Sequence, residues 1–182
     1  MEKIIDKQKK AFEALKDKFG YTNVMQAPKL EKVVVSVGVG SIVTDKRKVQ
    51  LIPEKLEKIT GQKALMRPAK KSIATFKVRE GQVSGYQTTL RGKMMTDFLD
   101  KLVNVALPRT RDFRGIKREG ADEMGNYSLG IKENSIFPET SDEDIRDIFG
   151  MSITIVTSAK SEKEVVAFLE FLGFPFKKEE QA

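Results

Sequence analysis

The sequence predicts an α+β fold, in which a mostly antiparallel sheet has helices packed on one face and carries a long basic loop. Stretches with apolar residues at helical spacing alternate irregularly with β-branched runs at strand spacing. Polar side chains follow one face of two of these runs, and an antiparallel sheet can leave such a face open to solvent. Nothing repeats at a fixed period and no long linker occurs, so residues 1–182 are predicted to form a single domain.

Four helices are predicted, and each is followed by a residue that stops a helix. They cover residues 4–19, 44–60, 94–106 and 162–172, with the stop signals Gly20, Gly61, Pro108 and Gly173. The first helix can either pack into the core or act as a docking arm. Pro53 is expected to kink the second helix or to divide it in two. A capping box that begins at Ser161 opens the last one.

Five strand segments are predicted, and two of them carry polar rows. The segments are Leu30–Val37, two strands within residues 61–93 on either side of a loop, Gly125–Ile131 and Met151–Thr157. The second strand of residues 61–93 carries the row of Gln87, Thr89 and Arg91. In the first segment, alternation places Lys32, Val34 and Ser36 on one face and three valines on the other. The face with Lys32 and Ser36 is similar to the row at 87–91, which predicts a shared hydrogen-bonding surface.

Residues 61–93 form a dense basic stretch with eight Lys or Arg and one acid, Glu80. Within it, residues 69–85 contain few apolar side chains and two glycines, which predicts a mobile hairpin loop that orders on binding. Such a loop can be merely solvated. However, charge and ordered polar rows coincide here, and this favours binding of a polyanion.

The net charge of +7 is divided unequally along the chain. The basic part, residues 1–118, has 27 Lys and Arg against 12 Asp and Glu, whereas the acidic part, residues 119–182, has 6 against 14. The basic part can neutralise phosphates, and the acidic part is suited to water or to a basic protein. No apolar run approaches a membrane span and the N-terminal residues lack a signal-peptide core, so an intracellular protein without a membrane partner is expected.

The composition argues against an enzyme. The chain has no cysteine, histidine or tryptophan, which removes thiolate nucleophiles, imidazole bases and the usual zinc ligands. The clustered carboxylates at 122–123 and 142–144 lie in polar segments that would not shift their pKa values. Glycine motifs for nucleotide phosphates are incomplete, since Val43 stands where the dinucleotide fingerprint needs its third glycine. No catalytic residue, metal site or cofactor is therefore expected.

A second basic cluster at residues 109–118 includes Arg109, Arg111 and Arg114, with Phe113 among them. Arginines with an aromatic ring suit RNA phosphates and exposed bases. Phe113 can equally be buried, and the sequence leaves the two interpretations level.

Several motifs, in order along nearly the whole chain, resemble a known family. They include Ala69–Ser72 (AKKS), Thr89–Gly92 (TLRG), Arg111–Gly115 (RDFRG), Gly125–Tyr127 (GNY) and Ile136–Glu139 (IFPE). The RDFRG and GNY blocks are highly specific. The chain is similar to the bacterial form of the fifth protein of the large ribosomal subunit, a family of 5S rRNA-binding ribosomal proteins.

The resemblance implies a cytoplasmic, ribosome-bound protein of the central protuberance. Its implied partners are 5S rRNA, large-subunit rRNA, P-site tRNA, other 5S rRNA-binding ribosomal proteins and a basic protein of the small-subunit head. Members of the family reach P-site tRNA with the lysine-rich loop and form an intersubunit bridge.

The polar rows and the resemblance together suggest a role for individual residues. The expected 5S rRNA contacts are Lys32, Ser36, Gln62, Thr89 and Arg91. The expected tRNA contacts are Lys70, Lys71, Ser72 and Arg79, in an arm from Ala69 to Gln82. Contacts with other rRNA are expected from Arg109, Arg111 and Arg114. The intersubunit bridge is expected to involve Asp142, Glu143 and Asp144.

The sequence departs from the usual family pattern at two positions, Ser36 and Pro53, and an alternative function is also considered. Ser36 stands where the family usually has asparagine, so a contact there can lose one hydrogen bond or be bridged by water. Pro53 is unusual in its helix. The alternative is an RNA-binding regulator that works off the ribosome, which co-sedimentation with the large subunit would distinguish from a ribosomal component.

Overall fold

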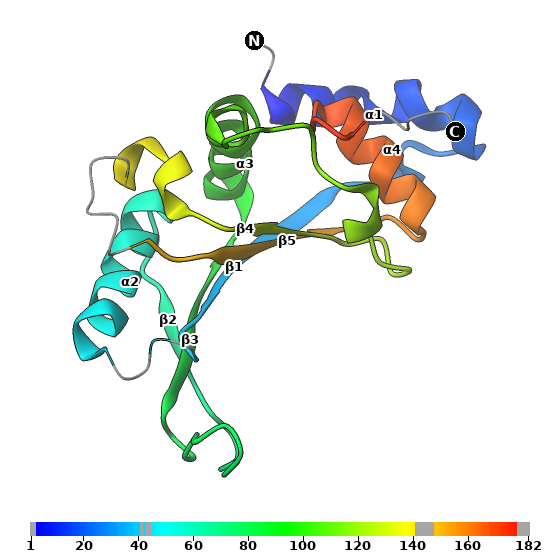
Figure 1. Cartoon of the computed structure of the whole chain (residues 1–182). Coiled ribbons are helices and arrows are strands. Elements are labelled where there is room, and N and C mark those ends of the chain that lie inside the picture. The colour runs from blue at the N-terminus through cyan, green and yellow to red at the C-terminus, as the bar shows by residue number, and fades with distance from the viewer. Residues whose placement is uncertain (1–2, 41, 43–44, 141–147, 178–182) are drawn as a thin grey trace. The chain divides into compact units, whose positions relative to one another are not determined.

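A computed structural model describes residues 3–40, 42, 45–140 and 148–177 of the chain, and its fold is α+β as predicted (Figure 1). The elements are α1 (Ile4–Phe19), β1 (Leu30–Gly38), α2 (Lys46–Thr60), β2 (Leu65–Pro68), β3 (Val83–Leu90), α3 (Gly92–Lys101), β4 (Tyr127–Ile131), β5 (Met151–Thr157) and α4 (Glu162–Leu172). Short helical turns lie at Val24–Gln26, Leu107–Arg109, Arg118–Gly120, Asn134–Ile136 and Pro138–Thr140, and a π-helical segment at Leu102–Ala106 continues α3.

The strands form one antiparallel sheet in the order β2-β3-β1-β5-β4. Burial alternates along β1, β4 and β5, so each of these strands has one covered face and one more open face. This is the pattern of an antiparallel sheet with a single covered side. It agrees with the predicted packing of helices on one face.

By its internal contacts the chain divides into two compact units, each made of segments that are distant in the sequence. The first unit contains residues 1–33, 91–129 and 154–182. The second unit contains residues 34–90 and 130–153.

In the first unit, α1 is a core element. It packs against α3 and α4, and Ile4, Ala11 and Leu15 are buried. The backbone N–H of Ile4 donates to Oδ1 of Asp100 on α3 at 3.1 Å, and Nζ of Lys7 donates to the carbonyl of Leu172 at the end of α4 at 2.8 Å. A cation at a helix C-terminus offsets the unpaired carbonyls there. Of the two interpretations open for this helix, core packing is the one observed.

The start of α4 contains a buried carboxylate with two donors. Ser161 caps the helix by accepting from the N–H of Glu164, as the predicted capping box requires. The Glu164 side chain accepts from the N–H of Lys160, one residue earlier than a standard box, at 2.7 Å. It also accepts from the hydroxyl of Tyr21. Burial, that hydrogen bond and the negative charge of Glu164 raise the pKa of Tyr21 well above its usual range.

Tyr21→Phe is expected to lower the free energy of unfolding by about 1.5–3 kcal/mol, the range for a hydrogen bond to a charged group. The substitution leaves a buried Glu164 oxygen without its donor. Urea titration measures the loss. Tyr86→Phe is the matched control, because the Tyr86 hydroxyl has no hydrogen-bond partner in the described part of the chain. Equal stability of the two variants would mean that the Tyr21 hydroxyl does not support the fold.

In the second unit, α2 packs against β3. Asp45 caps the helix by accepting from the N–H of Lys48 at 3.3 Å, and Gly61 ends it in the left-handed region, at φ 71°. The helix is continuous through Pro53, so it is not divided in two. A proline removes one hydrogen bond within a helix, and packing of the flanking Ile52 and Leu56, both buried, holds the helix together across that gap.

The helix after β3 changes type along its length. It is α-helical to Lys101 and π-helical from Leu102 to Ala106, and it ends in the 3₁₀ turn that contains Pro108. The predicted end at Pro108 is confirmed. On this helix Met95 is buried, whereas Met94 is 40% exposed.

Candidate nucleic-acid interface

The predicted polar face of β1 exists. Lys32, Val34 and Ser36 are half-buried on one side of the strand, while the alternate valines are fully buried on the other. The β-branched run at 33–37 produces this arrangement, because successive side chains of a strand point to opposite faces. Lys32 and Ser36 therefore lie on the more open face.

Strand β3 presents a matching row. Gln87 and Thr89 are half-buried on one face, and Thr88 and Leu90 are almost fully buried on the other. Arg91 follows directly and is exposed, in extended backbone at the start of α3. In the order of the sheet, β3 is the neighbour of β1, so Thr89 and Ser36 lie on adjacent strands of the second unit.

Gln62 is placed by the end of α2. It follows Gly61, and its backbone is fixed by Thr60, whose Oγ1 accepts from the Gln62 N–H at 3.3 Å. The amide of Gln62 is exposed. Gln62, Ser36 and Thr89 belong to the second unit, whereas Lys32 and Arg91 belong to the first.

The five expected 5S rRNA residues share one property. In the described part of the chain, none of their side chains makes a hydrogen bond or an ion pair. A cation or amide without an intramolecular partner keeps its full hydrogen-bonding capacity for a ligand. Residue spacing along the chain does not reveal this property, because the partners of a side chain depend on residues that are distant in the sequence.

The arm, residues 69–82, continues the β2–β3 hairpin beyond the sheet (Figure 1). Pairing runs from Leu65 opposite Gln87 to Pro68 opposite Val83, with an irregularity between Arg67 and Pro68. The arm then has its own hydrogen bonds, between Ala69 and Gln82 at 2.8 Å and between Ile73 and Val78 at 2.9 and 3.2 Å. It is thus a second, smaller hairpin. Whether it is mobile until it binds stays a prediction.

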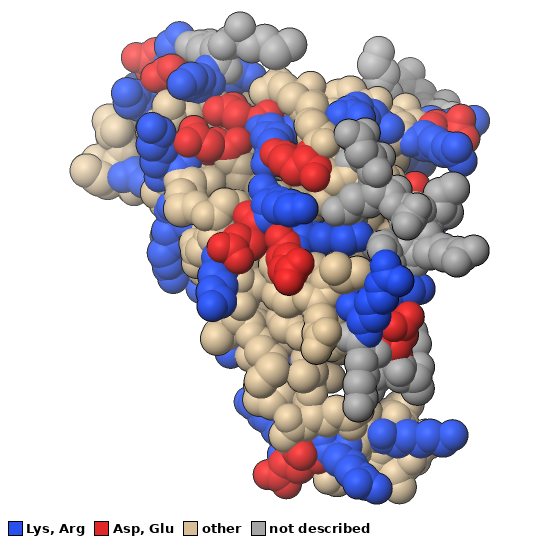
Figure 2. All heavy atoms as spheres, turned by 90° about the vertical axis from the view of Figure 1, so that its left-hand side faces the viewer, with Lys and Arg blue, Asp and Glu red and all other residues tan. Residues whose placement is uncertain are grey.

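Most of the arm is exposed, and its charge is unpaired. Lys70, Lys71 and Arg79 are exposed and their side chains have no partner among the described residues. The Oγ of Ser72 accepts from the Glu80 N–H at 2.9 Å, so this hydroxyl also supports the arm itself. Figure 2 shows the lower end of the molecule, where the arm ends, with more blue than red side chains.

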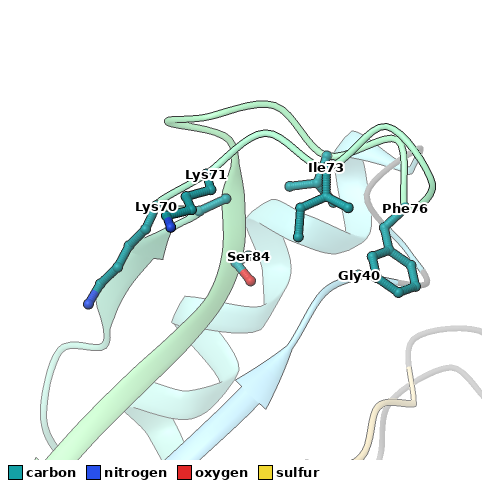
Figure 3. A pocket seen from close by; sticks show the side chains of 8 residues that line it. Gly40, Lys70, Lys71, Ile73, Phe76 and Ser84 are labelled. Carbon is teal, nitrogen blue, oxygen red and sulfur yellow. The ribbon is translucent and has the colours of Figure 1, made fainter.

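An open hollow of about 640 Å³ lies beneath the arm (Figure 3). Ile73 and Phe76 point from the arm toward it, Gly40 lies on the facing segment, and Ser84 lines it from β3. Lys70 and Lys71 contribute to the same lining. Phe76 is 73% exposed, so the arm presents an aromatic ring as well as cations.

The second basic cluster is exposed at each expected position, Arg109, Arg111 and Arg114. Asp112 adopts a left-handed conformation with φ 50°, which turns the chain sharply there. Phe113 is half-buried, and both interpretations of it stay open. Arg118 has a structural contact, an ion pair with Glu170 at 3.4 Å.

The expected bridge residues Asp142, Glu143 and Asp144 lie outside the described residues. The segment that leads to them is held in the second unit by Asn134, which is buried. Its Oδ1 accepts from the Phe149 N–H at 3.1 Å, and its carbonyl accepts from Oγ1 of Thr140 at 2.7 Å.

Within the described residues, the structure contains neither a candidate metal site nor a helix that could span a membrane. No group of three or more acidic side chains there could hold a metal ion. No helix there is long and apolar enough to cross a membrane.

Comparison with known proteins identifies the family. The sequence model described as "Ribosomal protein L5" matches residues 23–79, and the model that describes the C-terminus of the same ribosomal family matches residues 83–176. The chain belongs to the L5 family of ribosomal proteins. The two matched ranges include all five strands and the second basic cluster, and they leave out only residues 80–82 of the basic stretch.

Relatives named "Large ribosomal subunit protein uL5" match this L5 chain over most of its length. That of Flavobacterium johnsoniae is 54% identical over 165 residues, which are 91% of this chain and 90% of the relative. That of Desulfotalea psychrophila is 55% identical over 165 residues, 91% and 92% of the two chains. That of Geobacter sulfurreducens is 51% identical over 169 residues, which are 93% of this chain and 94% of the relative. The predicted family is confirmed, and these names support the prediction that the chain is not an enzyme.

Proposed function

We propose that this protein, as a structural constituent of the large ribosomal subunit, binds 5S rRNA and helps attach it to the large-subunit rRNA in the central protuberance. The observation that carries the proposal is the set of unpartnered polar side chains along β1 and β3. Lys32 and Ser36 lie on the more open face of β1, Thr89 lies on β3 and Arg91 follows it, and none of the four side chains has a partner among the described residues. Exposed cations lower the free energy of RNA binding by releasing counterions from phosphates. Neutral amides and hydroxyls beside them can bond 2′-hydroxyls, phosphates and base edges.

Arg91→Ala tests this function. The variant should bind isolated 5S rRNA more weakly by about 1–3 kcal/mol, the range for one good arginine contact. Its melting temperature should stay nearly unchanged, because Arg91 is exposed and its side chain supports nothing else among the described residues. Fluorescence anisotropy with labelled 5S rRNA at fixed salt measures the affinity.

Lys163→Ala is the matched control for Arg91→Ala. It removes the same charge from an exposed position on α4, in the acidic part of the chain. Its affinity should equal that of the unmodified protein. If Arg91→Ala also binds like the unmodified protein, the face is not the 5S rRNA site.

The arm is proposed to contact P-site tRNA through Lys70, Lys71, Ser72 and Arg79. Unpaired cations on a projecting hairpin suit contact with a phosphate backbone. Such contact carries no base readout, and a protein that serves every tRNA needs this lack of discrimination.

The remaining proposed contacts are assigned by charge, with basic residues on RNA and acidic residues on a basic protein. Arg109, Arg111 and Arg114 are exposed cations suited to other rRNA. The acidic part would be repelled by RNA, so Asp142, Glu143 and Asp144 are proposed to meet a basic protein of the small-subunit head and form an intersubunit bridge. Other 5S rRNA-binding ribosomal proteins are the last of the proposed partners. The protein is proposed to act in the cytoplasm, bound to the ribosome.

A further inference from the structure

Arg67 is held in place by a neutral side chain on the neighbouring strand. Its Nε donates to Oε1 of Gln87 at 2.7 Å, from β2 to β3 within the second unit. The residue directly opposite Arg67 in the pairing is Gly85, which has no side chain to cover the guanidinium. Arg67 itself is exposed.

This hydrogen bond orients the guanidinium without neutralising it. Arginine has five N–H donors, and the bond to Gln87 uses only the one on Nε. The two terminal amino groups, with four donors, have no partner among the described residues. Arg118 provides a contrast, because its terminal nitrogen faces the Glu170 carboxylate at 3.4 Å.

An oriented, fully charged guanidinium is suited to bidentate binding of a phosphate. The position of Arg67 fits this chemistry, since Gln87 belongs to the polar row of β3 that also contains Thr89. The sole acid in the basic stretch, Glu80, lies in the arm and forms no ion pair with Arg67. The polar row therefore continues from β3 to the edge strand β2.

We propose that Arg67 binds an RNA phosphate through its terminal amino groups and that Gln87 is the residue that positions it. The inference rests on the proposed function and extends the RNA-binding face to β2. Arg67 is the contact, and Gln87 acts through it by limiting the rotamers of the guanidinium before RNA arrives.

Binding of 5S rRNA is measured as a function of salt for Arg67→Ala, Arg67→Lys, Gln87→Ala and the double variant Arg67→Ala/Gln87→Ala. Arg67→Ala should weaken binding about tenfold and reduce the slope of log affinity against log salt by about one phosphate contact. Arg67→Lys should keep the salt slope but lose about threefold or more in affinity, because lysine has neither the fork nor the Nε anchor.

Gln87→Ala distinguishes positioning from direct contact. It should weaken binding severalfold in the otherwise unmodified protein and have no further effect when Arg67 is already alanine. A Gln87→Ala effect of the same size in both backgrounds would overturn the positioning role. Lys163→Ala again controls for the loss of one charge.

Two other outcomes separate this inference from the proposed function. If Arg91→Ala weakens 5S rRNA binding and Arg67→Ala does not, Arg67 is not a 5S rRNA contact and the proposed 5S rRNA face stands without β2. If neither variant weakens binding of 5S rRNA, the proposed 5S rRNA function fails, and the inference fails with it unless Arg67→Ala weakens binding of tRNA. An equal affinity loss in Arg67→Ala and Arg67→Lys with an unchanged salt slope would show that Arg67 only supports strand pairing.

The same variants are titrated with deacylated tRNA to identify the RNA. A loss confined to 5S rRNA assigns the phosphate to 5S rRNA, and a loss confined to tRNA assigns it to the ligand of the arm. Unchanged binding of both RNAs in Arg67→Ala would overturn the proposal.

Discussion

Gly125→Ala should destabilise the protein by at least about 3 kcal/mol, the largest effect expected of any single substitution considered for the fold. Gly125 has φ +78°, a conformation that costs a residue with a side chain about 1–2 kcal/mol. A Cβ there would overlap the carbonyl oxygen of Ala159 and lie 2.5 Å from its carbonyl carbon. Both atoms belong to backbone that cannot move away cheaply, so strain and overlap add.

The surrounding hydrogen bonds increase the cost. Oγ1 of Thr157, which is buried, donates to the Gly125 carbonyl at 2.6 Å and accepts from the Ala159 N–H at 3.1 Å. Moving residue 125 outward would therefore break a buried network as well as a turn.

Gly130→Ala is the matched control. Gly130 lies on β4, five residues along the chain, and a Cβ added there would meet no atom within 4 Å. Its stability should stay within about 0.5 kcal/mol of the unmodified protein. Urea unfolding of both variants measures the difference, and equal midpoints would contradict the close approach of residues 125 and 159.

Removal of the arm should have the largest functional effect and almost no effect on the fold. Residues 70–81 are replaced by two glycines, so that Ala69 and Gln82, whose backbones bond at 2.8 Å, keep the hairpin in register. Release of P-site tRNA from ribosomes carrying this protein should accelerate by about tenfold or more, which is the loss of one to two charge-assisted contacts.

The fold should tolerate the replacement, because residues 70–77 are all exposed and the hydrogen bonds of the arm are internal to the hairpin. The melting temperature and the affinity for 5S rRNA should stay nearly unchanged. A large fall in the melting temperature would mean that the arm supports the core.

A second variant identifies which feature of the arm binds. Replacing Lys70, Lys71 and Arg79 with glutamine keeps the backbone and Phe76 but removes the charge. We expect it to reproduce most of the acceleration for every tRNA tested, since contact with the phosphate backbone does not depend on sequence. An unchanged release rate for several tRNAs, in both variants, would exclude the arm as a tRNA contact.

The sequence alone determined most elements, because they depend on local signals. Gly20, Gly61 and Gly173 each follow the end of a helix and adopt the positive φ that glycine permits. Strand alternation at 32–37 correctly separated the open face from the buried face, since side-chain direction in a strand is fixed by position. The roles of Lys32, Ser36, Gln62, Thr89 and Arg91 rest on those local patterns and on the family motifs, and they stay predictions.

Only the tertiary structure decided features that depend on distant residues. The packing of α1, the continuity of α2 through Pro53 and the buried bond between Tyr21 and Glu164 each need a partner far along the chain. The bond between Arg67 and Gln87 depends on the register of β2 against β3, which the irregularity at Arg67 and Pro68 shifts. Residue spacing gives the direction of a side chain within its own element, but the partner it meets is fixed by how the chain folds back.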